Sequence, residues 1–123
     1  MQTLLLLALA GALGASARYA LTLGIAALLP RTFPWAIFIV NVTGCALFGL
    51  IWELAAVRGI LSDATRVILL VGFMGSFTTF STLIFDCDAM LRQEQWVMLT
   101  CNLCGQVILG IAALRFGLWL ARG

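Results

Sequence analysis

Charged residues are scarce in this sequence, and lysine and histidine are absent. Acidic and basic residues together make up 10% of the 123 residues, whereas soluble globular domains contain about 25%. Without histidine the chain lacks the commonest general acid–base group and metal ligand. It also shows no nucleophile paired with a base, so we predict that it is not an enzyme. The net charge of +2 is too small and too scattered to indicate binding to nucleic acid.

Two local patterns permit interpretations that their surroundings disfavour. Cys101 and Cys104 form the motif CNLC, but the motif lies in an apolar run without a second cysteine pair. We therefore expect packing residues here, and no metal or redox site. The first residues, MQTLLLLALAGALGASARYA, lack the basic stretch that precedes the apolar run of a signal peptide. We expect them to form a retained membrane span.

Apolar residues make up 63% of the chain and collect in four long segments. An α-helix needs about 20 apolar residues to cross a bilayer, and each segment is long enough. The expected spans are residues 3–29, 35–57, 65–91 and 96–120. The segments do not alternate apolar with polar residues as membrane strands do. The predicted fold class is therefore an all-α membrane protein, with four transmembrane helices in one domain, residues 1–123.

The joins between the spans are short. Pro30 and Pro34 end the first helix, and Ser62 or Asp63 can cap the third. Glu53 and Arg58 are expected to be solvated or interfacial. With the N-terminus inside, the inner side holds four arginines and the outer side two, a weak bias that permits insertion in both orientations. Four short helices enclose little volume, so we expect an oligomer.

The stretch GFMGSFTTFST, Gly72 to Thr82, is unusually rich in glycine and hydroxyl groups for a membrane span. Glycine weakens a helix interior by about 1 kcal/mol relative to alanine. Serine and threonine hydroxyls can bond backbone groups that an interrupted helix leaves free. The stretch thus predicts a third helix broken near mid-membrane, where transporters and channels bind ions. The alternative is a helix kinked for packing, with its hydroxyls bonded to their own turn.

This stretch resembles the signature of the Fluc (CrcB) family of fluoride channels. GALGASARY (Gly11 to Tyr19) and VNVTGCALFG (Val40 to Gly49) resemble the first-span and second-span patterns of that family, and the likeness extends over essentially the whole chain. It implies an antiparallel, dual-topology dimer with two pores, which conducts fluoride passively out of the cytoplasm across the inner membrane. It also implies a structural sodium ion at the dimer centre, held by the backbone carbonyls of Gly75 and Thr78.

By motif position, the same resemblance places six residues along the fluoride path: Asn41, Phe80, Ser81, Thr82, Asn102 and Gln106. Amide and hydroxyl groups can donate to an anion, and the edge of an aromatic ring is electropositive. Judged without the family, the amides could equally join helices. Arg18 is expected to draw anions into a vestibule or to pin the break. Asp86 is expected to line the pore mouth or to pair with an arginine.

The sequence departs from the family pattern at several positions. Leu83 replaces a second phenylalanine, and Gly110 replaces a serine, which leaves a heterodimer open beside the homodimer. Two other functions are considered. A small multidrug-type exporter needs a carboxylate in its first span, and this span has none. A membrane subunit without transport activity would use its polar residues as contacts between helices.

Overall fold

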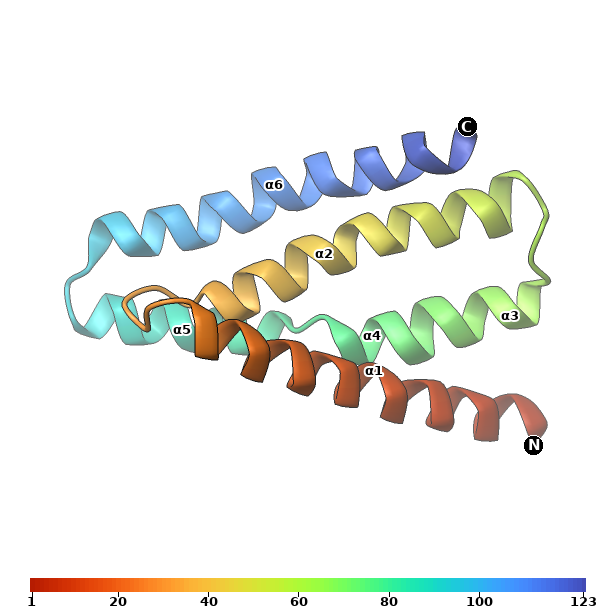
Figure 1. Cartoon of the computed structure of the whole chain (residues 1–123), viewed down its shortest axis with the longest axis horizontal. Coiled ribbons are helices and arrows are strands. Elements are labelled where there is room, and N and C mark those ends of the chain that lie inside the picture. The colour runs from red at the N-terminus through yellow and green to blue at the C-terminus, as the bar shows by residue number, and fades with distance from the viewer.

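The computed structural model describes all 123 residues, and nearly all of them lie in helices. The elements are α1 (Gln2–Leu28), α2 (Trp35–Trp52), α3 (Asp63–Val67), α4 (Gly75–Phe77), α5 (Phe80–Arg92) and α6 (Trp96–Arg122), with π-helical segments η1 (Glu53–Val57) and η2 (Ile68–Met74). They form an elongated bundle whose two termini lie at the same end (Figure 1). Four helical runs are long and apolar enough to cross a membrane: Gln2–Leu28, Trp35–Val57, Asp63–Arg92 and Trp96–Arg122. The prediction of an all-α protein with four membrane-competent helices is confirmed.

The third run is not a continuous α-helix. After α3 it winds as the π-helical η2 and then as the single turn α4. Thr78 and Thr79 then have extended backbone, with ψ angles of 160° and 113°, before α5 begins at Phe80. The Thr79 side chain accepts a hydrogen bond from the backbone N–H of Thr82 at 3.3 Å, and so caps α5. The π-helical turns had no recognisable signal in the sequence.

The start of α3 and the turn between α5 and α6 are set by residues at those positions. Of the two caps predicted, Ser62 or Asp63, the structure has Ser62: its hydroxyl accepts the N–H of Thr65 at 3.2 Å and caps α3. Between α5 and α6 the chain reverses at Glu94, which adopts a positive φ of 55°. This tight reversal makes α5 and α6 antiparallel neighbours (Figure 1).

Three pairs of elements account for most of the packing: α2 with α6, α1 with η2, and α1 with α4. The contact of α2 with α6 depends on Gly49 and Gly117. A Cβ atom on Gly49 would overlap the carbonyl oxygen of Leu114, and one on Gly117 would overlap that of Ala46. The two helices therefore touch backbone to backbone, as small residues permit in membrane bundles.

The subunit buries little of its apolar surface. Only 21 of the 123 residues are buried, and the core cluster consists of Val40, Leu70, Met74 and Phe77. Most large apolar side chains on the four runs point outward. A surface of this kind suits lipid or another protein chain. It would be unfavourable in water.

Candidate functional site

A chain of hydrogen bonds joins α2, the interruption before α5, α5 itself and α6. The backbone N–H of Thr79 donates to Asn41 Oδ1 at 2.8 Å. Asn41 Nδ2 donates to the Thr79 carbonyl at 3.1 Å and to Gln106 Oε1 at 2.7 Å. Gln106 Nε2 donates to Asn102 Oδ1 at 2.8 Å, and Asn102 Nδ2 donates to Cys87 Sγ at 3.6 Å. These five residues are termed the amide chain.

The amide chain is buried within the subunit. Asn102 is 0% exposed and Gln106 is 7% exposed, while Thr79 and Cys87 are buried beside them. Buried amides are costly unless they are hydrogen-bonded, and the side-chain oxygens of Asn41, Gln106 and Asn102 each accept a bond. Three of the residues predicted along the ion path are therefore brought together.

Two members of the amide chain were not among the predicted site residues. Thr79 takes part through its backbone, and Cys87 was expected only to pack. A signal for Cys87 was present, since it lies six residues before Gln93 and Asn102 lies seven residues after Gln95, at the two ends of one turn. An antiparallel pair of helices brings such positions face to face.

The other predicted pore residues lie at the start of α5. Thr82 Oγ1 is 2.9 Å and Ser81 Oγ is 3.4 Å from Thr79 Oγ1, so these hydroxyls belong to the cap of the interrupted helix. Phe80 is 73% exposed and points away from the core, whereas Leu83 is buried. The Phe80 ring is thus available on the outer surface of the subunit.

The interruption changes the bonding of the two carbonyls expected to hold sodium. In a continuous helix the N–H of Thr79 would donate to the carbonyl of Gly75, but here it donates to Asn41. The Thr78 carbonyl lies on extended backbone and accepts from Arg18 Nη1 at 3.5 Å. Carbonyl oxygens suit a hard cation, so the donor chemistry fits, although two oxygens from one subunit are too few to complete a coordination shell.

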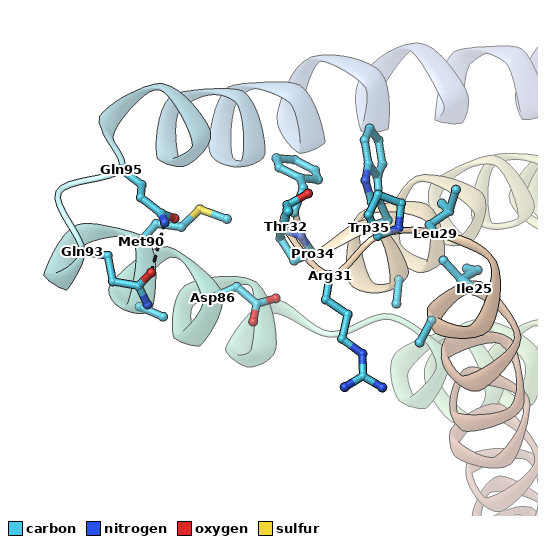
Figure 2. A pocket seen from close by; sticks show the side chains of 15 residues that line it. Ile25, Leu29, Arg31, Thr32, Pro34, Trp35, Asp86, Met90, Gln93 and Gln95 are labelled. Atoms are coloured by element: carbon cyan, nitrogen blue, oxygen red, sulfur yellow. Dashed lines mark hydrogen bonds between the residues drawn. The ribbon is translucent and has the colours of Figure 1, made fainter.

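A cavity of about 500 Å³ opens at the end of the bundle where the α1–α2 connection meets α5. Its polar lining includes Arg31, Asp86, Gln93 and Gln95 (Figure 2). The Oδ2 atom of Asp86 is buried and has no hydrogen-bond partner, and no ion pair joins Asp86 to an arginine. Of the two roles considered for Asp86, the geometry favours lining a cavity.

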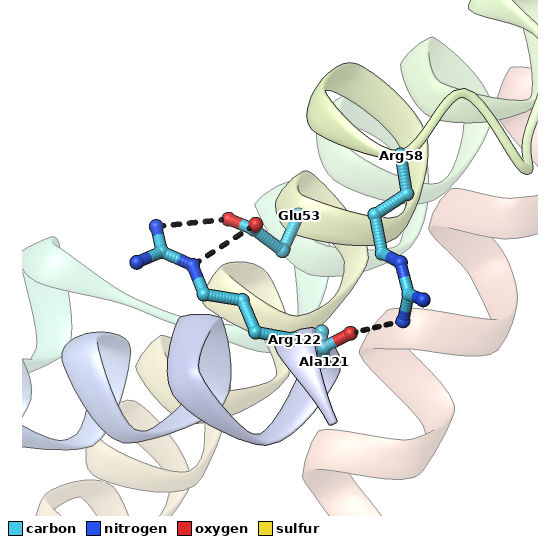
Figure 3. A network of polar contacts seen from close by, with 4 residues as sticks. All are labelled: Glu53, Arg58, Ala121 and Arg122. Atoms are coloured by element: carbon cyan, nitrogen blue, oxygen red, sulfur yellow. Dashed lines mark hydrogen bonds and ion pairs between the residues drawn. The ribbon is translucent and has the colours of Figure 1, made fainter.

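The opposite end of the bundle is fastened by charged residues (Figure 3). Arg122 binds Glu53 through two hydrogen bonds of 3.0 and 3.3 Å, and Arg58 donates to the carbonyl of Ala121 at 2.6 Å. Glu53 is only 3% exposed. Of the two settings expected for Glu53, solvated or interfacial, the solvated one is wrong, because the carboxylate faces α6 and is neutralised there. These bonds hold the end of α6 against η1.

Comparison with known proteins identifies relatives over nearly the whole chain. The family model described as "CrcB-like protein, Camphor Resistance (CrcB)" matches residues 5–118. A protein of Solidesulfovibrio magneticus named "Fluoride-specific ion channel FluC" is 50% identical over 116 residues, which cover 94% of this chain and 93% of the relative. Proteins with the same name from Nitratidesulfovibrio vulgaris and Nitrosococcus oceani are 45% and 42% identical, over 99% and 98% of this chain. From these matches we conclude that the chain belongs to the CrcB-like family.

Proposed function

We propose that the chain forms a fluoride-selective ion channel, which works as an antiparallel dimer of two copies and exports fluoride from the cytoplasm. The observation that carries the proposal is the buried run of amides Asn41, Gln106 and Asn102 beside an interrupted helix. Relatives up to 50% identical are named as fluoride-specific channels. Polar groups inside a membrane span are costly unless they are paired or used, and here each amide keeps its oxygen bonded within the subunit.

A passive pore is sufficient for export. Hydrogen fluoride is a weak acid that crosses membranes uncharged and dissociates in a near-neutral cytoplasm. The fluoride that accumulates must leave as the anion. Both its concentration gradient and a membrane potential that is negative inside drive an anion outward. To lower fluoride toxicity, the cell therefore needs a pore that is selective for fluoride, and it needs no energy source.

Selectivity requires donors that replace the tight hydration shell of fluoride. Uncommitted amide N–H groups on Gln106 and Asn102, hydroxyls at the start of α5, and the electropositive edge of the Phe80 ring are such donors. None carries a full positive charge, so the anion is bound weakly at each step. Several weak sites in series let an ion enter and also leave.

The exposed groups near the interruption support a second copy of the chain. Phe80 and Gly75 are exposed on one subunit, where a partner would cover them. A partner in the opposite orientation would bring a second ring toward each path and give two pores per dimer. The Gly75 and Thr78 carbonyls of both copies would together hold a sodium ion, which would supply fixed positive charge at the dimer centre. Arg18, bonded to Thr78, would support this region.

Fluoride efflux from liposomes that contain only the purified chain tests the proposal. We expect rapid efflux of fluoride, read with a fluoride electrode, and none of chloride. The Gln106→Leu variant should slow efflux by roughly tenfold or more, because it removes donors from the path. Val107→Leu is the matched control, since its side chain is exposed on the same helix. Absence of efflux from folded, dimeric protein would refute the homodimeric channel and point to a required second subunit.

A further inference from the structure

The direction of every amide in the amide chain follows from one backbone group. The N–H of Thr79 can only donate, so the atom of Asn41 that faces it must be Oδ1, at 2.8 Å. Asn41 Nδ2 must then face Gln106, and Gln106 must accept the hydrogen bond through Oε1, at 2.7 Å. The helix interruption frees the Thr79 N–H from its usual helical partner, and so it sets the first link.

The same reasoning continues to the far end. Once Gln106 has turned its oxygen to Asn41, its nitrogen faces Asn102, which must accept through Oδ1, at 2.8 Å. Asn102 is then left with its nitrogen toward Cys87, whose sulfur accepts at 3.6 Å. A thiol can donate or accept weakly, so the direction given by Thr79 requires this thiol to accept.

This alignment changes what an anion would meet. Each of the three amide oxygens is occupied by a donor from within the chain. The Asn41 nitrogen uses its N–H groups on Thr79 and Gln106. One N–H each on Gln106 and Asn102 stays uncommitted. A free amide presents an acceptor as well as donors, but the amides of this chain are left with donors only. This favours an anion, because an unoccupied carbonyl oxygen would repel it.

We propose that Cys87 is a positioning residue of the ion path. Its sulfur accepts from Asn102 and holds the last amide in the direction that Thr79 sets, so that N–H groups of Gln106 and Asn102 face the anion. An asparagine amide rotates easily about its terminal torsion, whose distribution is broad. The bonds to Gln106 and Cys87 restrain the Asn102 amide, and without an acceptor at position 87 it loses one of them. Asn41 acts in the same way, as a positioning residue more than a direct contact. The inference rests on the proposed fluoride channel and deepens it.

The test compares Cys87→Ala with Cys87→Ser, which restores an acceptor, and with Cys104→Ala, which removes an exposed thiol from α6. The first measurement records the side-chain amide resonances of Asn102, Gln106 and Asn41 in labelled protein without fluoride. Cys87→Ala should shift the resonances of Asn102 and Gln106, and that of Asn41, which has no hydrogen bond to Cys87. In Cys87→Ser the hydroxyl accepts more strongly than the thiol, so the Asn102 amide protons should move downfield of their wild-type positions, while the resonances of Gln106 and Asn41 should return toward wild type. Cys104→Ala should leave all three unchanged.

The second measurement is efflux from liposomes. Cys87→Ala should lower fluoride efflux about threefold to tenfold, the range set by the loss of one weak hydrogen bond, and should lower the preference for fluoride over chloride. Cys87→Ser should recover both.

The two measurements separate the two claims. If wild-type protein passes no fluoride, the proposed function fails, while the resonances still test the amide chain. Unchanged Asn102 and Gln106 resonances in Cys87→Ala, or equal shifts in Cys104→Ala, would overturn the positioning role. If Cys87→Ala does not fold, Cys87→Ser decides: a hydroxyl accepts more strongly, so the Asn102 amide protons must move downfield, and unmoved protons would overturn the proposal.

Discussion

Adding one methyl group at Gly117 should separate α2 and α6, the two helices that carry the three amides of the proposed ion path. A Cβ atom there would overlap the carbonyl oxygen of Ala46 and lie 2.9 Å from its carbonyl carbon and from the nitrogen of Leu50. All three atoms belong to the α2 backbone and cannot rotate away as a side chain would. To reach ordinary contact distances, α2 and α6 would have to move apart by on the order of 1 Å.

The expected loss of stability is the difference between two terms. Overpacking of a close contact costs about 1–3 kcal/mol, and a clash with backbone belongs at the upper end. Alanine gains about 1 kcal/mol over glycine in a helix interior. For Gly117→Ala we therefore expect a net loss of about 2 kcal/mol in the free energy of unfolding. Gly24→Ala is the matched control, since no atom lies within 4 Å of a Cβ there, and it should be neutral or slightly stabilising.

The same change should reach the amide chain. Asn41 on α2 and Gln106 on α6 are joined at 2.7 Å, so a wider spacing of the helices lengthens this bond. Unfolding in denaturing detergent, followed by circular dichroism, measures the stability, and liposome efflux measures conduction. We expect both to fall in Gly117→Ala only. If this variant matched Gly24→Ala in stability and in efflux, the reasoning from backbone contact would be refuted.

Gly44→Ala should lower fluoride efflux, because a Cβ at position 44 would overlap the Thr78 methyl group and displace it. Adding Thr78→Ser removes that methyl, keeps the hydroxyl and should restore the efflux. A double variant that stays slow would exclude crowding as the cause. Thr79→Ala should lower the free energy of unfolding by about 1 kcal/mol because α5 loses its cap, and Thr79→Ser should recover most of it; equal losses in the two variants would contradict the capping role. Arg122→Ala should destabilise more than Glu53→Gln, because it leaves a carboxylate that is 3% exposed without its partner. Midpoints of unfolding in one detergent compare these two, and the reverse order would count against a buried, neutralised carboxylate.

Much of the fold was accessible from composition and spacing alone. Long apolar runs between short polar joins predicted the four helices, because a bilayer requires about 20 apolar residues per span and internal satisfaction of the backbone. The interruption at Thr78 and Thr79 lies inside the stretch that glycines and hydroxyls had singled out. Local chemistry also narrowed the cap of α3 to Ser62 or Asp63, of which the structure has Ser62. These features depend on residues near in sequence and on the solvent, and both can be read without coordinates.

The sequence by itself determined that this is a four-helix membrane protein with amides at Asn41, Asn102 and Gln106. It did not determine how those amides are used. Their partners come from different helices, so the choice depends on the register of α2 against α6, which the backbone contacts at Gly49 and Gly117 set. Only the tertiary structure placed Cys87 at the end of the amide chain and showed Glu53 to be buried and paired. Hydrogen bonds act over about 3 Å, so which residues dozens of positions apart become partners depends on how the helices pack. Those partners can be identified only once the fold is known.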